Sequence, residues 1–364
     1  MKNTAFFGRR GLVQGLGAML MLSACSGSTG TAVRGSKGPG GRQVRMLLPL
    51  TGPGAAIGAN MARAANLVSG VVDGNTDLPA IINTTDTPEG AAEAAAKAVK
   101  DGARLLLGPL RADQVAQVLQ AAGSVPVVSF SNEEGPRTKG AFLFGVTPAQ
   151  SVATMLTYAQ AQGAMRIAVL TIDGGLGQAT LEAARRLTAA AGMDLVAELV
   201  RDPATGGSAA ALRQASGGVM PDAVFLPDGG KALTGFARDL AGSGLQLMGG
   251  VQWGTAEVAA NPDLAGAWFA GPPPEAFQTF SAQYETAFGT LPGLITALAY
   301  DAAMLGVELG NANGLSKAGL TRARGFDGAL GHYRFNDGGT CRRDLAVMAI
   351  EGGHIVSLGE VTET

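Results

Sequence analysis

Six short segments of the chain combine glycines with hydroxyl, amide or charged side chains, and each directly follows an apolar run. They are residues 50–54, 108–111, 129–133, 172–176, 227–230 and 252–254. Hydroxyls, amides and the backbone N–H groups beside glycines can bond the carboxylate or amide of a small solute, and Trp253 offers a ring for stacking. The chemistry of these segments therefore predicts that the chain binds a small molecule.

The candidate ligand contacts are the residues of these segments that carry a suitable group or bring the backbone close to a solute. They are Thr51, Gly52, Pro109, Leu110, Arg111, Ser129, Ser131, Asn132, Glu133, Asp173, Gly175, Leu176, Asp228, Gly229, Gln252 and Trp253. Any one of them is better explained as a helix cap or a turn. The prediction therefore depends on their recurrence at the same point of successive units.

Motifs for catalysis and for metal binding are absent from the sequence. There is no G-x-S-x-G, no S-x-x-K and no phosphate loop. Residues 52–58 resemble a dinucleotide fingerprint, but the glycine spacing is one residue too long and Pro53 lacks an N–H for a pyrophosphate. The two histidines, His332 and His354, do not have the spacing of a metal site. We expect no enzyme activity, no cofactor and no metal.

Strands and helices alternate through most of the chain, and they must position these segments. The expected strands are residues 44–50, 80–83, 104–107, 125–129, 166–171, 194–200, 223–226 and 246–251. Amphipathic helical stretches separate them, which is typical of βαβ units and parallel sheets covered on both faces. Because the pattern occurs on either side of residue 147, it predicts an α/β fold of two doubly wound lobes. In such sheets ligands bind outside the carboxyl ends of the strands.

The predicted lobes interleave along the chain. Residues 44–147 plus 271–324 form lobe 1, and residues 148–270 plus 325–364 form lobe 2, with a hinge near Pro148 and Gly271 and a cleft between the lobes. The final segment is expected to contain antiparallel strands at residues 331–334, 345–350 and 354–358, because glycine-rich turns separate them.

The composition fits a large folded domain. Hydrophobic residues make up 46% of the chain and charged residues 15%, with a net charge of -2. The sequence contains no basic run, so nucleic acid is not an expected partner.

The first 24 residues have the pattern of a signal peptide. Lys2, Arg9 and Arg10 precede an apolar stretch, residues 12–22, that is too short to cross a membrane. Leu22, Ser23 and Ala24 before Cys25 resemble the lipobox of bacterial lipoproteins, and residues 25–43 are rich in Gly and Ser, as in a flexible tether. The paired arginines also resemble a twin-arginine signal, so this export route and the general one both stay open.

The lipobox resemblance implies that Cys25 carries lipid and anchors a periplasmic protein to a membrane. Ser26, in place of Asp, favours the outer membrane by the same resemblance. Cys341 then has no partner within the chain, so it is either a buried apolar residue or a thiol that could pair between chains.

Several segments resemble type I periplasmic binding proteins, the superfamily of the Leu/Ile/Val-binding proteins. Residues 47–53 are similar to the opening of that family, 105–110 and 125–129 to its third and fourth strands, and 166–170 to the start of its second lobe. The resemblance implies a two-lobed fold with a hinge and a ligand cleft.

Two branches of this superfamily come into question. Residues 86–92, 226–230, 268–274 and 299–302 look closer to penicillin-binding protein activators, which are lipoproteins thought to stimulate peptidoglycan synthases. The hydroxyl cluster, the tyrosine and the acidic group that branched-chain receptors use are replaced here by residues 110–112, 174–176 and 252–253. The resemblance therefore predicts a non-enzymatic activator whose partners are penicillin-binding proteins. The alternative is an ABC-transporter substrate-binding lipoprotein for branched-chain amino acids or a similar small polar solute, with an ABC permease as partner.

Overall fold

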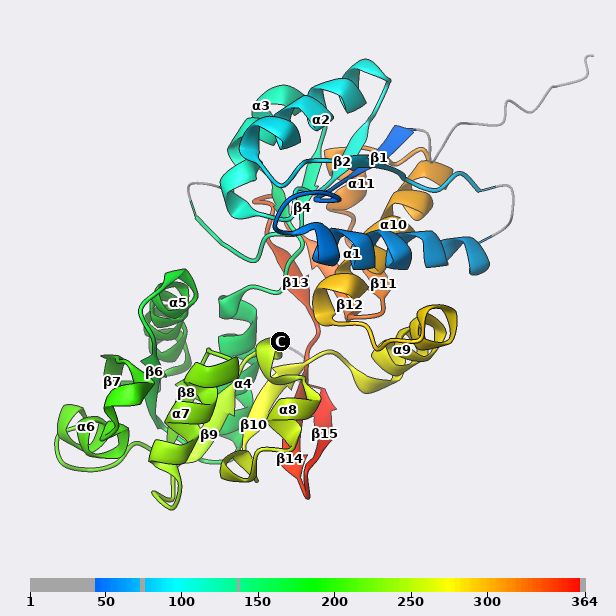
Figure 1. Ribbon diagram of the computed structural model, residues 1–364. Coiled ribbons are helices and arrows are strands. Elements are labelled where there is room, and N and C mark those ends of the chain that lie inside the picture. Colours follow the sequence, from blue (N-terminus) through cyan, green and yellow to red (C-terminus); the bar gives the residue numbers. More distant parts are fainter. Residues whose placement is uncertain (1–42, 73–75, 136–137, 361–364) are drawn as a thin grey trace, which may run out of the picture. The chain divides into compact units, whose positions relative to one another are not determined.

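The computed structural model describes residues 43–72, 76–135 and 138–360 (Figure 1). The predicted signal peptide, Cys25 and all of the predicted tether before residue 43 lie outside the described residues.

A five-stranded parallel sheet forms the centre of the first lobe. Its order is β2 (Ala80–Asn83), β1 (Val44–Leu48), β3 (Leu105–Leu107), β4 (Val127–Ser129) and β5 (Phe142–Leu143). The helices of this lobe are α1 (Ala55–Leu67), α2 (Pro88–Lys100), α3 (Val115–Ala122), α9 (Pro274–Phe288), α10 (Leu294–Asn311) and α11 (Lys317–Leu320), with short 3₁₀ turns at Val68–Gly70 and Ala112–Gln114.

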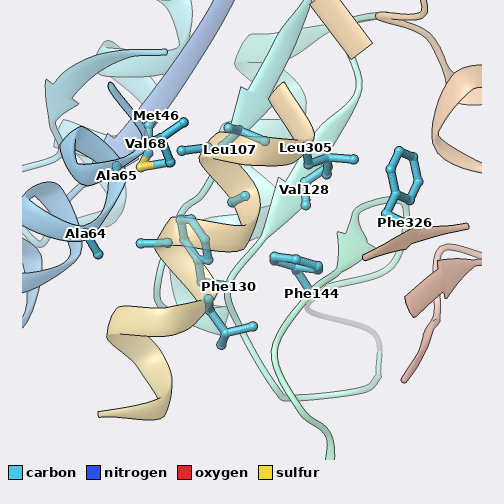
Figure 2. Packing of buried hydrophobic residues seen from close by; sticks show 14 of the residues in the cluster. Met46, Ala64, Ala65, Val68, Leu107, Val128, Phe130, Phe144, Leu305 and Phe326 are labelled. Atoms are coloured by element: carbon cyan, nitrogen blue, oxygen red, sulfur yellow. The ribbon is translucent and has the colours of Figure 1, made fainter. Parts of the chain in front are cut away.

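Alternation of side chains along the strands places two apolar layers on this sheet. Met46 and Leu48 point into the core formed with α1 and α10, whereas Leu47 points into the core formed with α2 and α3. Figure 2 shows Met46 next to Ala65 of α1 and Val68 of the 3₁₀ turn that follows it. Because both faces are covered, apolar residues run continuously along the strands, as expected from the sequence.

Helix α2 shows how the sequence sets an element boundary. The Thr87 hydroxyl accepts a hydrogen bond from the Gly90 N–H at 3.0 Å, and Pro88 occupies the first turn. Glu89 lies in the first turn, where it complements the positive end of the helix dipole. The cap, the proline and the acidic residue together fix where α2 begins.

A seven-stranded sheet forms the centre of the second lobe. Its order is β15 (His354–Glu360), β14 (Ala346–Glu351), β10 (Trp268–Gly271), β9 (Gln246–Gly249), β8 (Ala223–Leu226), β6 (Arg166–Thr171) and β7 (Asp194–Val200). Its helices are α4 (Pro148–Ala161), α5 (Gly175–Ala191), α6 (Ser208–Ala215), α7 (Gly230–Leu240) and α8 (Ala256–Ala259), with 3₁₀ turns at Pro203–Thr205, Val251–Trp253 and Pro262–Leu264. Strands β6 to β10 are parallel, whereas β14 and β15 are antiparallel to their neighbours.

A third sheet of three short antiparallel strands corrects the predicted lobe boundary. It consists of β11 (Phe326–Gly328), β12 (Gly331–Phe335) and β13 (Cys341–Arg343). Phe326, Tyr333 and Phe335 pack in the same core as β1 and α10, although the sequence-based division assigned all of residues 325–364 to lobe 2. Large aromatic side chains on one face of this sheet complete the apolar layer of the first lobe. The other predicted boundaries stay proposals.

Cys341 belongs to this core. Its side chain is buried, and burial raises the pKa of its thiol to about 11. A thiol that is rarely ionised is a poor nucleophile, so Cys341 acts as a small apolar residue, the first of its two expected roles.

Candidate ligand-binding cleft

A cavity of about 720 Å³ lies at the carboxyl ends of strands from both large sheets. This volume is within the range of small-molecule sites. The residues around it come from the loops after β3, β4 and β9, from the connection after β5, from the first turns of α1, and from the segment that opens α10. They are Ile57, Asn60, Leu110, Arg111, Phe130, Ser131, Asn132, Gly145, Val146, Val251, Gln252, Gly254, Thr255, Gly293, Leu294, Ile295, Thr296 and Leu298.

Five of the predicted contacts lie at this cavity. Leu110 and Arg111 follow β3, Ser131 and Asn132 follow β4, and Gln252 follows β9 in a 3₁₀ turn. They meet because the carboxyl ends of parallel strands lie at one edge of each sheet. Together they bring one cation, two amides and one hydroxyl to an otherwise apolar space.

Arg111 carries the positive charge of this group. Its side chain is 54% exposed, and its Nε lies 3.4 Å from Asp113 Oδ1 and 4.0 Å from Asp86 Oδ1. Asp86 is only 2% exposed and accepts hydrogen bonds from the Gly54 N–H at 2.8 Å and from Gln114 Nε2 at 3.4 Å. Asp86 therefore joins the loops after β1, β2 and β3 and lies behind the guanidinium of Arg111.

Several predicted contacts lie outside the cavity because they hold the loops themselves. The Thr51 hydroxyl accepts a hydrogen bond from Asn83 Nδ2, and Gly52 has a positive φ of 85° where an added Cβ would meet the Thr85 carbonyl oxygen. The buried Ser129 hydroxyl donates to the Pro109 carbonyl oxygen, and Glu133 donates its N–H to the Ser131 hydroxyl. Among the predicted contacts, Thr51, Gly52, Pro109, Ser129 and Glu133 therefore do not line the cavity.

Trp253 is not the stacking wall that the sequence suggested. Its side chain is fully buried, and its indole N–H donates to the Asp228 carbonyl oxygen at 3.1 Å. An added Cβ on Gly249 would come within 2.1 Å of the ring, so the indole packs directly on β9. Trp253 is part of the core of the second lobe, where a large aromatic side chain buries the most apolar area.

Asp228 is also buried rather than presented to a ligand. Its Oδ2 accepts hydrogen bonds from the Thr171 hydroxyl at 2.9 Å and from the Ile172 N–H at 3.1 Å. Burial raises the pKa of this carboxyl, and the hydrogen bonds from Thr171 and Ile172 oppose the rise. Asp228 therefore joins the ends of β6 and β8.

The remaining predicted contacts do not line the main cavity either. Asp173 lies at a separate hollow of about 290 Å³ beside Val200 and Arg201. Gly175 and Leu176 form the first turn of α5, and Gly229 precedes α7 as its N-cap.

The most informative residues that sequence reasoning missed are apolar side chains at helix starts. Ile57 has the helical spacing of the buried Met61 and Ala64, but it is 43% exposed at the cavity, and Ile295 of α10 is 39% exposed there. Helix periodicity identifies an apolar face but not the point at which that face leaves the core. The sequence gives one partial signal for this exposure: both residues belong to the first turn of their helices.

Three chain segments connect the lobes, after β5, after β10 and after β13. The first ends at Thr147, whose hydroxyl accepts a hydrogen bond from the Gln150 N–H in a capping box that starts α4. Gln150 Oε1 in turn accepts from the Thr147 N–H at 3.0 Å, and its Nε2 donates to the Cys341 carbonyl oxygen. One amide side chain thus joins the first connection to the start of β13, the strand that leads into the third connection.

Comparison with known proteins decides the family. A family model described as periplasmic binding protein matches residues 43–354. The chain belongs to the periplasmic binding protein family. A comparison with curated protein sequences found no match.

Solved structures of this family share the fold. A putative branched-chain amino acid ABC transporter protein from Rhodospirillum rubrum has a TM-score of 0.76 at 20% identity, with 86% of this chain and 99% of that chain covered. A branched-chain amino acid transporter substrate-binding protein from Streptococcus pneumoniae, in complex with isoleucine, has a TM-score of 0.63 at 17% identity, covering 88% and 99%. A solute-binding protein of an ABC transporter from R. palustris, in complex with benzoate, has a TM-score of 0.62 at 18% identity, covering 88% and 97%.

Among the described residues, no helix combines the length and the apolar character needed to cross a membrane. Within the same residues, no three His, Cys, Asp or Glu side chains gather as ligands for a metal ion.

Proposed function

We propose that this protein is a solute receptor, which captures a small organic molecule in the cleft and delivers it to an ABC permease. One observation carries the proposal: the 720 Å³ cavity is bordered by strand-end loops of both large sheets and contains exposed apolar side chains. This observation favours the substrate-binding receptor, which the sequence analysis named as the alternative, over the penicillin-binding protein activator.

The exposed apolar side chains are what makes the cavity a binding site. Ile57 and Ile295 leave roughly two fifths of their surfaces in water inside a concave space. Burial of apolar surface is worth about 25 cal/mol per Å², so an apolar ligand that covers both side chains gains free energy on binding. Concave sites lined by apolar side chains with a few polar groups are typical of small-molecule binding.

The known relatives support the same reading. Those with solved structures are mainly ABC-transporter proteins, and their descriptions name isoleucine in one case and benzoate in another. These solutes differ in charge, so the relatives indicate the kind of function but not the solute.

The activator reading depends on sequence segments that have structural roles here. Thr87 caps α2, Asp228 joins β6 to β8, and residues 268–271 form β10 inside the second sheet. Asp301, in the segment of residues 299–302, is fully buried in α10. Segments that fold the chain can be shared by proteins with different partners, so they favour the activator only weakly. Stimulation of a bifunctional peptidoglycan synthase by the purified protein is the result that would restore it.

We further propose that Cys25 bears lipid and that the protein is anchored in the periplasm. Family membership implies the periplasm, and the lipobox resemblance of residues 22–25 supplies the anchor. An ABC permease lies in the inner membrane, whereas Ser26 favours the outer one. Fractionation of the two membranes, with Cys25→Ala as control, decides which membrane holds the protein.

Binding measurements test the receptor function directly. The protein purified from membranes in detergent is heated with a panel of amino acids, organic acids and amides, and the shift in unfolding temperature is recorded. A ligand at 100 times its dissociation constant adds about 2.7 kcal/mol to the free energy of unfolding.

A pair of variants assigns binding to the cleft. Ile295→Gln changes a side chain at the cavity, whereas Leu291→Gln changes a 72% exposed apolar side chain that does not line it. We expect Ile295→Gln to weaken binding about tenfold, the loss of roughly 1.4 kcal/mol of apolar contact, and Leu291→Gln to leave it unchanged. No shift with any panel member would count against the receptor function.

A further inference from the structure

We infer that the solute is an organic anion, with one carboxylate on an apolar body and no ammonium group, and that Arg111 binds the carboxylate. This inference rests on the proposed receptor function and names its substrate class. It separates this chain from receptors for amino acids, which carry both charges.

The described lining of the cavity carries positive charge and no negative charge. Among the described residues that line it, Arg111 is the single formally charged side chain, and the other polar groups there are amides and hydroxyls. Asn60 and Gln252 can bond either a neutral or an anionic oxygen, whereas a guanidinium selects an anion and can hold a carboxylate through two parallel hydrogen bonds.

The position of Asp86 orients the guanidinium for this task. Both acidic neighbours, Asp86 and Asp113, approach Arg111 at its Nε. Nε is the guanidinium nitrogen nearest to each carboxylate, so the two Nη atoms lie farther from both acids. The Nη atoms are therefore the part of the side chain available to a ligand in the cavity.

No acidic side chain lines the described part of the cavity to meet an ammonium group. Of the acidic side chains nearby, Asp113 is partly exposed and pairs with Nε of Arg111. The side chain of Asp86 is 2% exposed and accepts two hydrogen bonds, and Asp228 is buried between β6 and β8. An amino acid would bring its cation into a space whose one formal charge is positive. Enclosing a charge without a partner of opposite sign is strongly unfavourable.

The walls of the cavity fit an apolar body. Ile57, Leu110, Val251 and Ile295 all line it, from α1, from the loops after β3 and β9, and from α10. A branched or aromatic acid can cover these side chains while its carboxylate reaches Arg111. A sugar or a small polar amide would leave them in contact with hydroxyl groups, without the gain from apolar burial.

Matched ligands test the inference on the protein purified from membranes. The pairs differ only in the amino group or the acid: 4-methylpentanoate against leucine, 3-phenylpropanoate against phenylalanine, and benzoate against benzamide. Equilibrium dialysis gives each dissociation constant. We expect at least one carboxylate to bind, and its amino acid or amide partner to bind at least 100-fold more weakly.

Arginine variants test the role of Arg111. Arg111→Gln is expected to weaken carboxylate binding at least 100-fold, and Arg111→Lys less, because a lysine keeps the charge without the two parallel donors. The control is Arg324→Gln, since Arg324 is an exposed arginine outside the cavity that pairs with Glu308 at 2.6 Å. It should leave binding unchanged.

The outcomes separate the two proposals. Suppose that leucine binds, that Ile295→Gln weakens leucine binding, and that Arg111→Gln does not. The receptor function then stands, and the inference of an anionic solute is overturned. Equal binding of benzoate and benzamide overturns it as well. If no ligand binds, both proposals fall. Selective carboxylate binding that depends on Arg111 supports both.

Discussion

The carboxylate of Asp301 lies 3.5 Å from Nη1 of Arg343, and both side chains are fully buried in the first lobe. Asp301 comes from α10, and Arg343 ends β13, immediately before the third connection between the lobes. The Asp301 carboxylate also accepts hydrogen bonds from the N–H groups of Ala329 and Leu330. The guanidinium lies over the rings of Phe144 and Tyr333, at 4.9 and 4.8 Å from their centres. The contacts of Arg343 with Asp301 and the two rings hold the start of the third connection against the core of the first lobe.

Replacing Arg343 should strongly destabilise the protein. Arg343→Leu removes two cation–π contacts and leaves the buried Asp301 without its opposite charge, so we expect a loss of about 3–5 kcal/mol in the free energy of unfolding. Urea denaturation measures it. The control, Arg342→Leu, changes an exposed arginine on the other face of the same strand, and exposed ion pairs contribute less than about 1 kcal/mol. Equal losses for the two variants would contradict a special role for the buried pair.

The stability of the protein should depend on pH through Asp301. Burial raises the pKa of its carboxyl from 3.8 to about 6, although Arg343 opposes the rise. The folded state then binds a proton that the unfolded state has released, so this group's contribution to stability is complete below pH 3.8 and is lost as the pH rises through about 6. Relative to the wild type, Asp301→Asn should gain stability between pH 4 and pH 6.5. Parallel urea-denaturation profiles over this range would rule the effect out.

The fold could be predicted where apolar strands are long and separated by helices. The six-residue strand β6 contains a continuous apolar run, and α2 carries its own cap and first-turn proline. Strands of two to four residues, such as β5, β10 and β11, are too short to show a period. Their pairing depends on contacts with residues far away in the sequence. The strand at residues 331–334 was therefore predicted, but its pairing with β11 and β13 and its place in the first lobe were missed.

The site could be predicted only in its loops. Arg111 and Asn132 were found because they follow strands, and all carboxyl ends of a parallel sheet share one edge. Trp253 follows a strand as well, and no local signal distinguishes an aromatic ring that turns into the core from one that faces a ligand. Ile57 and Ile295 were invisible for the opposite reason, because an apolar residue on a helix looks like core until the neighbouring elements are placed.

Two glycines of the second lobe should respond very differently to a methyl group. An added Cβ on Gly249 would lie 2.1 Å from the ring of Trp253, whereas the nearest atom to one on Gly254 is 3.7 Å away. We expect Gly249→Ala to cost about 1–3 kcal/mol, because a tightly packed core cannot absorb the extra atom. Gly254→Ala, at the cavity wall, should change stability by less than about 0.5 kcal/mol. Thermal or urea unfolding of both variants checks the difference, and a stable Gly249→Ala would mean that the indole can move aside.

Gln150 should hold the first connection between the lobes to β13, the strand that leads into the third connection. Gln150→Ala removes the bond that its Oε1 accepts from the Thr147 N–H and the bond that its Nε2 donates to the Cys341 carbonyl oxygen. Two lost hydrogen bonds predict a decrease of about 1–3 kcal/mol in stability. Amide hydrogen exchange should rise in residues 144–147 and also in residues 341–345, because the first connection and β13 lose the side chain that joins them.

A second cap serves as the control for Gln150. Thr87→Ala removes the cap of α2, which bonds only the local Gly90 N–H and the neighbouring Thr85 hydroxyl, and such a change costs about 1 kcal/mol. Its exchange effect should be confined to the start of α2. If Gln150→Ala also affects only the first turn of its own helix, the connections are held by other contacts, and Gln150 is an ordinary capping residue.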